Sequence, residues 1–265
     1  MRIKKYSSDL SPKSWQVIEK IIQVRRKSKW DLEEIVNSIL YLTKNGCVWR
    51  DIPGEFPPWI TIYWRPSLRY YCKWVNDGTW KNMSDCLTVD FREKQGKKTQ
   101  PTVAIIDSQS SKNSSTCSEN VGIDGGKLIK GRKRFCIVDT LGNLLDSFVV
   151  SANYYDGTTA IKYWRSLSCH NILLDNVTKI YADGTFGGTF SKEMIERYSI
   201  TVEIPKIPIA QKGKITIHEK KWIVERTIAW TLNNRRCSKE YERKTEHSNT
   251  FLIIGNIRRL AKKIT

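Results

Sequence analysis

The sequence contains few histidines, no closely paired cysteines and no long apolar run, and each absence excludes a class of protein. Its seven cysteines are scattered without a Cys-x-x-Cys pair, and only three histidines accompany them, so we expect no zinc site. An odd, unpatterned cysteine count is typical of reduced thiols in a cytoplasm. No segment approaches the roughly 20 apolar residues of a membrane span, and the N-terminus lacks the apolar stretch of a signal peptide. We therefore expect a cytoplasmic protein without a membrane partner.

Acidic residues are also in the minority. The chain has 27 Asp and Glu against 45 Lys and Arg, which gives a formal net charge of +18. Such a surplus attracts polyanions, and counterions released from neutralised phosphates supply most non-specific affinity for nucleic acids. Binding to a membrane surface is the rival interpretation, but it needs an amphipathic basic helix or an apolar anchor, and neither is evident. Nucleic acid is therefore the expected partner.

Residues 1–95 have the pattern of a helical domain. Ser11 offers an N-cap followed by proline, and apolar residues then recur at helical spacing. Asp31 opens a second helix, in a pattern that resembles a capping box, and this helix is expected to stop at Gly46. A further helix is expected from residue 80 to about 92. Several short helices on a basic chain favour a helix-turn-helix-like DNA-binding domain, although the tryptophans of this region also suit a simple core.

The period of the apolar residues changes after a polar linker at residues 94–100, which indicates a second domain over residues 101–262. The hairpin signature Gly142-Asn143 lies between two of its predicted strands. The strands expected here cover residues 102–106, 135–139, 144–150, 179–182 and 201–204, and helices are expected at 157–167, at 189–198 and from about Glu219. Strands followed by alternating helices and strands indicate an α/β domain with a mixed central sheet.

Two of these strands are expected to end on an aspartate, Asp107 and Asp183. Catalytic groups of α/β sheets gather beyond strand ends, where side chains are held rigidly yet reach solvent. The plain alternative is that each aspartate only begins a turn. Glu225 is the third candidate, since on a helix it shares a face with Trp222 and Ala229, a stripe otherwise suited to burial. Its plain alternative is an exposed glutamate paired with the next arginine.

Metal binding would explain a joint site of these three acids. Buried carboxylates must be neutralised, and oxygen ligands without cysteine or histidine favour Mg²⁺ or Mn²⁺ over zinc. Two such ions, about 3.5–4 Å apart, would stabilise the attacking and leaving oxygens of an in-line phosphoryl displacement. On the pattern alone, whether the three acids converge stays open.

Two basic clusters accompany the acids. Residues 127–134 lead straight into a predicted strand, and a second cluster follows Glu225 on its helix. Either cluster suits phosphate contacts, and either also suits a solvated face that only keeps the protein soluble. The candidate DNA contacts are Lys130, Arg132, Lys133, Arg134, Arg226, Arg235, Arg236 and Lys239.

Five ordered blocks of the sequence resemble transposases of bacterial insertion sequences, most closely the fourth-and-fifth insertion-sequence superfamily. The blocks are Ala104–Ser110, Gly131–Arg134, Val138–Gly142, Tyr181–Gly184 and Trp222–Trp230. The segments Asn45–Arg50, Phe56–Trp59 and Asp77–Trp80 look like the helical module that precedes the catalytic domain in that group. The likeness covers nearly the whole chain.

The resemblance implies a ribonuclease-H-like catalytic domain with Asp107, Asp183 and Glu225 as a metal-binding triad. It also implies two Mg²⁺ or Mn²⁺ ions, and double-stranded DNA, as element ends and as target, for a partner. Metal-activated water would cut DNA at the element's terminal inverted repeats, and the released 3′-hydroxyl would attack target DNA without a covalent enzyme intermediate. Joining two ends implies a homodimer or larger assembly on DNA, in a cytoplasmic, nucleoid-associated protein.

The sequence departs from the family at three places. Phe135 stands where a histidine is expected, Thr185-Phe186 replaces the usual Gly-Tyr, and residues 63–70 run longer and include Pro66, which would break a helix. Two alternatives therefore remain beside the transposase: a ribonuclease-H-like nuclease without strand transfer, and a DNA-binding protein whose catalysis has decayed.

Overall fold

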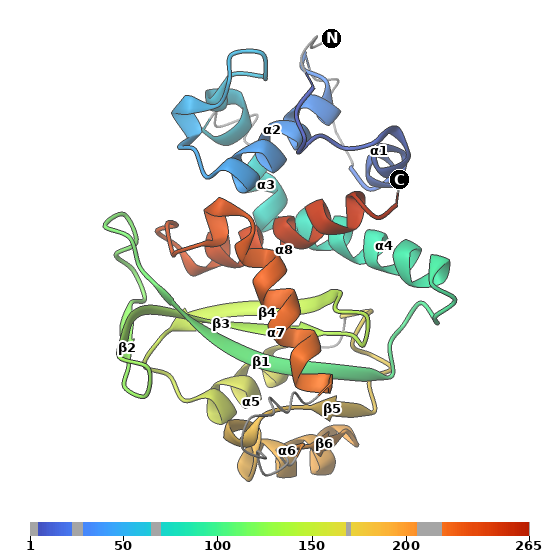
Figure 1. The fold of residues 1–265 in the computed structure, drawn as a ribbon, viewed down its shortest axis with the longest axis vertical. Helices are drawn as coiled ribbons and strands as arrows, with labels where there is room; N and C mark the ends of the chain where they lie inside the picture. Colours follow the sequence, from blue (N-terminus) through green and yellow to red (C-terminus); the bar gives the residue numbers. More distant parts are fainter. Residues whose placement is uncertain (1–4, 23–28, 65–69, 168–170, 206–218, 265) are drawn as a thin grey trace, which may run out of the picture.

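A computed structural model describes residues 5–22, 29–64, 70–167, 171–205 and 219–264. Small helices lie at one end of the molecule and a sheet with its own helices lies at the other (Figure 1). The α-helices are α1 (Pro12–Glu19), α2 (Leu32–Asn45), α3 (Tyr70–Asn76), α4 (Thr79–Lys94), α5 (Asp156–Ser166), α6 (Thr189–Tyr198), α7 (Glu219–Leu232) and α8 (Thr245–Ala261). Shorter helical turns are η1 (Trp49–Asp51), η2 (Ile60–Trp64), η3 (Gly184–Phe186) and η4 (Arg235–Cys237). The expected kink at Pro66 lies outside the described residues.

Helices α1 and α2 begin where the sequence predicts, and α2 also ends where it predicts, whereas α3 was not predicted. The Ser11 side chain accepts a hydrogen bond from the Ser14 backbone N–H at the start of α1. The Asp31 side chain accepts a hydrogen bond from the Glu33 backbone N–H at the start of α2, and Gly46 ends that helix with a φ of 71°. A left-handed residue at a helix C-terminus favours glycine because glycine has no Cβ to clash.

The sheet contains parallel and antiparallel pairs, as expected. Its strands are β1 (Val103–Lys112), β2 (Gly122–Asp124), β3 (Ile129–Val138), β4 (Leu144–Ser151), β5 (Lys179–Tyr181) and β6 (Thr201–Glu203). The strand order is β2-β3-β1-β5-β6, with β4 paired to β3. β1, β5 and β6 run parallel, while β3 pairs antiparallel with β1, β2 and β4. The predicted α/β class with a mixed sheet after a helical region is confirmed.

β1 is longer than its apolar run. The strand was expected to end at Asp107, but it continues through the polar segment to Lys112, so Asp107 lies in its middle. The reason is the register with β3, in which residues 105–112 pair with residues 138–131. Because side chains alternate along a strand, Asp107 shares a face with Ile105, and Ser108 shares the opposite face with Ile106.

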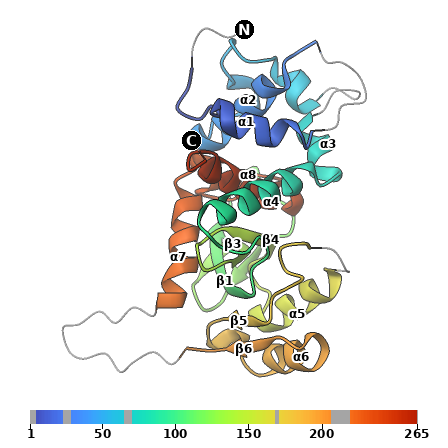
Figure 2. The same ribbon diagram turned by 90° about the vertical axis from the view of Figure 1, so that its right-hand side faces the viewer.

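Two hydrophobic clusters cover the two faces of the sheet. The first contains Ile105 with side chains of α1, α2, α4, α7 and α8, and the second contains Ile106 with side chains of α5 and α6. Figure 2 shows α4 and α8 on one side of the sheet and α5 and α6 on the other. Asp107 therefore faces the layer of α7, and Ser108 faces the layer of α5.

The last helix, α8, lies between the N-terminal helices and the sheet (Figures 1 and 2). Its side chains Phe251 and Ile254 are buried in the first cluster, which also holds Ile39 of α2 and Val138 of β3. The boundary expected near residues 95–101 thus stays a prediction, because the regions on its two sides share one core. Within the described ranges, no helix combines the length and apolar character that crossing a bilayer requires.

Candidate active site

Asp107 and Asp183 line one small cleft, of about 70 Å³. Asp107 lies on β1, and Asp183 follows β5, which pairs in parallel with β1 through Ile105 and Tyr181. Asp107 and Asp183 each lie two residues beyond this last pair of the parallel register, so the register itself brings the two acids together. Lys221 and Val224 of α7 complete the wall of the cleft.

The charge at Asp107 is poorly compensated. Burial is the main cause that raises its pKa to about 6, and the nearby charges of Asp183 and Glu225 raise it further. The backbone N–H of Ser108, which donates to Asp107 Oδ1 at 2.7 Å, and the charge of Lys221 act in the opposite direction. A carboxylate held among other acids in this way suits a site that receives a cation.

Asp183 is fixed by the short turn that follows it. Its Oδ1 accepts a hydrogen bond from the Thr185 backbone N–H at 2.9 Å, and so it caps η3. The Thr185 hydroxyl donates to the same oxygen. Both of these bonds are made to Oδ1, and Asp183 lines the cleft.

Glu225 lies at the border of the cleft and does not line it. Its side chain is 52% exposed, and its Oε1 is 3.8 Å from Lys221 Nζ, one turn earlier on α7. Within the part of the chain that the structure describes, no three His, Cys, Asp or Glu side chains are placed to hold one metal ion together. The structure therefore brings Asp107 and Asp183 together and leaves Glu225 close enough to act on Asp107 by its charge.

This donor set fits a hard divalent cation. The cleft offers carboxylate oxygens, no described cysteine or histidine lines it, and the charges of Asp183 and Glu225 raise the pKa of Asp107. Mg²⁺ and Mn²⁺ prefer such oxygen ligands. Glu225 is on an exposed helix face, so a change of its side-chain rotamer is enough to alter its direction.

Arg226, a predicted DNA contact, anchors α7. Its guanidinium lies 4.5 Å from the ring centres of both Trp222 and Trp230, and it donates to the Leu141 carbonyl at 3.2 Å. Gly142 in the same turn has a φ of 82°, and a Cβ there would lie 2.7 Å from the Thr227 hydroxyl. The close approach of α7 to the β3–β4 turn holds the helix that carries Glu225.

Three other predicted DNA contacts are buried, and their assignment is corrected. Arg132 is fully buried and donates to the carbonyls of Glu119 and Glu242 at 2.7 and 2.8 Å. Arg134 pairs with the buried Glu240, and Lys133 pairs with Asp156. Side chains enclosed by internal partners do not suit phosphate contacts. The basic run instead fastens β3 to the segment after α7 and to the start of α5.

The remaining predicted contacts lie nearer the surface. Lys130, Arg235 and Lys239 are exposed, whereas Arg236 is partly buried and pairs with Glu242 at 2.6 Å. These four stay predictions. The sequence interpretation missed Lys221, although its position one turn before Glu225 was a usable signal, and it missed Asp156, for which the linear sequence offered none.

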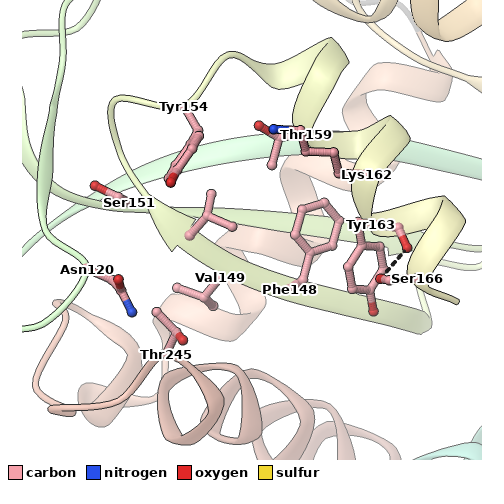
Figure 3. Close-up of a pocket in the computed structure, with 11 residues that line it drawn as sticks. Asn120, Phe148, Val149, Ser151, Tyr154, Thr159, Lys162, Tyr163, Ser166 and Thr245 are labelled. Carbon is pink, nitrogen blue, oxygen red and sulfur yellow. Dashed lines mark hydrogen bonds between the residues drawn. The ribbon is translucent and has the colours of Figure 1, made fainter.

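A larger cavity, of about 460 Å³, lies over β4 and α5 (Figure 3). Phe148 and Tyr163 stack in its floor with ring centres 3.8 Å apart, and Tyr154 and Lys162 lie at its edge. None of the described residues that line it is acidic. The described lining therefore offers no carboxylate ligand for a metal, and it shares no residue with the carboxylate cleft.

Comparison with known families gives two matches. Residues 98–257 match the family model described as "Transposase DDE domain". Residues 10–84 match the model described as "Putative transposase of IS4/5 family". No curated protein matches the chain.

Proposed function

The chain belongs to the DDE transposase family and is an enzyme that acts on DNA, and on that premise we propose that it cuts the terminal inverted repeats of an insertion sequence and joins them to target DNA. The predicted resemblance to the IS4/5 superfamily and the ribonuclease-H-like fold are confirmed. The finer steps and the residues that perform them are our proposal.

One observation carries the proposal: Asp107 and Asp183 share a cleft on neighbouring parallel strands, and Glu225 lies on the helix beside it. We assign these three residues as metal ligands and catalytic residues. Divalent ions, Mg²⁺ or Mn²⁺, would activate the attacking oxygen and stabilise charge on the phosphate when bound there. Asp107 and Asp183 supply preorganised oxygens, and Glu225 adds its own after turning from Lys221.

A cationic surface beside α7 fits the phosphate backbone of DNA. The Trp230 ring is approached by Arg226, Arg259 and Lys263, at 4.5, 5.1 and 5.0 Å. Burial and the charges of Arg259 and Arg226 lower the pKa of Lys263, which means that these cations repel one another. The exposed Lys262 precedes Lys263 in the chain and lies near the charges of Arg258 and Lys44. Because a strand of DNA would relieve this repulsion, we place the backbone of the bound DNA along this surface.

The exposed basic residues Lys130, Arg235 and Lys239, with the partly buried Arg236, remain candidates for further phosphate contacts. Arg226 would contribute through its charge, since its guanidinium is already stacked between two indoles. Joining two element ends requires two active sites to meet. We therefore propose that the protein acts on DNA as a homodimer or a larger assembly.

A cleavage and joining assay tests the proposed function. The full chain is incubated with Mn²⁺ and a DNA fragment that carries the inverted repeats flanking its coding region. Joined products are expected. Cut products without joining would instead support a nuclease of the same fold, and binding without any cut product would support a decayed enzyme.

A further inference from the structure

The carboxylate of Asp156 links the two acids of the cleft from the far side of the sheet. Its Oδ2 accepts a hydrogen bond from the Ser108 hydroxyl at 2.7 Å, and the Thr185 hydroxyl, which donates its proton to Asp183, lies 3.4 Å from the same oxygen. Ser108 is also the residue whose backbone N–H binds Asp107, and Thr185 is the residue whose backbone N–H binds Asp183. One buried carboxylate thus contacts the immediate partner of each acid.

Lys133 forms an ion pair with this carboxylate. Its Nζ donates to Asp156 Oδ1 at 2.6 Å and to the Tyr154 carbonyl at 3.0 Å. Only 10% of the Lys133 side chain and 12% of the Asp156 side chain are exposed. Asp124 lies 3.9 Å from the same ammonium group and is the other acid near it. A buried charge pair with its hydrogen bonds satisfied keeps both side chains in one orientation.

The backbone around Asp156 cannot easily shift. Asp156 is the first residue of α5, and a Cβ at the next residue, Gly157, would lie 3.0 Å from the Thr185 carbonyl oxygen. The start of α5 therefore packs directly against η3, the turn that Asp183 caps. A side chain at this position would make an unusually tight contact with the neighbouring backbone, so glycine is favoured here.

We propose that Asp156, fixed by Lys133, is a positioning residue that sets the relative placement of Asp107 and Asp183. The inference rests on the proposed function, since it concerns the same metal site. Asp107 lies in the middle of β1 and Asp183 follows β5, and Asp156 Oδ2 lies against the hydroxyls of both Ser108 and Thr185. One rigid carboxylate in contact with both hydroxyls is what fixes β1 against the turn after β5. Mutation of a residue that hydrogen-bonds a metal ligand or its partner typically lowers metal affinity or activity by about 10–100-fold.

The main test measures Mn²⁺ binding by the full chain without DNA, using electron paramagnetic resonance of the free ion. Asp156→Asn is compared with Asp85→Asn. Asp85 is a matched control because it also pairs with a lysine, Lys81, at 2.7 Å, and its side chain is 16% exposed on α4, away from the cleft. We expect Asp156→Asn to weaken Mn²⁺ binding by about tenfold or more and Asp85→Asn to leave it unchanged. Equal affinities in the two variants would overturn the inference.

Ser108→Ala keeps the Asp156–Lys133 pair intact and so guards against simple unfolding. It removes one hydroxyl link and leaves the Ser108 backbone N–H on Asp107. Thr185→Val removes the other hydroxyl, which contacts both Asp156 and Asp183, and Thr185→Ser restores it. We expect Ser108→Ala and Thr185→Val to weaken Mn²⁺ binding and to slow cleavage at limiting Mn²⁺, with recovery in Thr185→Ser. Wild-type Mn²⁺ dependence in both variants would contradict the positioning role.

Asp107→Asn separates the failure of this inference from failure of the proposed function. Loss of Mn²⁺ binding in Asp107→Asn together with wild-type binding in Asp156→Asn overturns the positioning role alone. Wild-type binding in Asp107→Asn overturns the metal site itself, and the positioning role falls with it.

Discussion

Lys221 Nζ lies 3.8 Å from Glu225 Oε1, and Lys221 also lines the cleft that holds Asp107 and Asp183. The lysine thus offsets part of the negative charge that the three acids concentrate. A cation that stands beside a proposed metal site has two opposite effects, because it repels the metal and attracts the phosphate of the substrate. The two effects can be measured separately.

Lys221→Met is expected to tighten Mn²⁺ binding a few-fold in the absence of DNA, because a competing positive charge is lost. The same change is expected to slow DNA cleavage, because a cation near the reacting phosphate is lost. Mn²⁺ titration and cleavage rates measure the two results. Lys220→Met, at the neighbouring position over the Tyr181 ring, is the control with smaller effects. Weaker Mn²⁺ binding in Lys221→Met would show that the lysine organises the acids.

Asp107→Asn, Asp183→Asn and Glu225→Gln are each expected to reduce cleavage below detection while DNA affinity stays within about twofold. Each change removes a proposed metal ligand, and none alters the cationic surface. Gel-shift and cleavage assays on the same preparations provide the comparison. The Glu225 variant is the most informative, because its side chain points to Lys221. A wild-type cleavage rate in Glu225→Gln would show that Glu225 is not a metal ligand.

Gly142→Ala is expected to destabilise the fold and to lower activity. The residue has a φ of 82°, and an added Cβ would lie 2.7 Å from the Thr227 hydroxyl, so α7 would have to move. Gly96→Ala is the matched control, with a φ of 66° and no atom within 4 Å of the added Cβ. Urea unfolding should show a loss of about 1–2 kcal/mol for backbone strain in the control and a larger loss for Gly142→Ala. An equal loss of unfolding free energy in the two variants would mean that α7 moves away from the added Cβ without destabilising the protein.

The stability of the folded protein is expected to depend on the protonation of Asp85. Burial raises its pKa to about 6, more than the charge and hydrogen bond of Lys81 lower it. A folded-state pKa above the unfolded value favours folding at low pH, and this contribution is lost as the pH rises from about 4 to about 6. Asp85→Asn, which has no charge to bury, should therefore gain stability relative to the parent protein over that range. The gain is at most about 3 kcal/mol, and a pH-independent difference in unfolding free energy would refute it.

Replacing Lys262 and Lys263 by glutamine is expected to weaken DNA binding and to reduce its salt dependence. Each phosphate contact removed lowers the slope of log affinity against log salt by about one. Lys192→Gln, on the exposed face of α6 away from α7, should leave the slope unchanged. If the parent protein, the doubly substituted variant and Lys192→Gln all show the same slope of log affinity against log salt, the DNA does not contact Lys262 and Lys263.

The acidic residues of the candidate site could be predicted from the sequence, whereas the strand pairing around them could not. Asp183 follows a short apolar strand and begins a turn, so its position was readable from local pattern. Asp107 was expected at a strand end, yet β1 continues past it because the polar half of β1 pairs with the basic half of β3. Local propensity does not show such a pairing. The register of two distant segments decides it.

The basic run was misread for a related reason. Lys and Arg are rarely buried unless paired, so an isolated run favours the surface. The partners Glu240 and Asp156 are distant in sequence, and nothing local marks them as acceptors for Arg134 and Lys133. Helix α8 was not predicted either. It is buried on most of its sides, so it lacks the one-sided apolar stripe by which surface helices are recognised.

The place of α8 has a consequence for how the protein is made. This helix supplies core side chains both to the N-terminal helices and to one face of the sheet. The ribosome synthesises it after nearly all the segments it packs against, so the core between the N-terminal helices and this face of the sheet cannot close on the growing chain. Folding has to be completed after α8 emerges, and a premature stop codon before it leaves two exposed apolar surfaces instead of a working half.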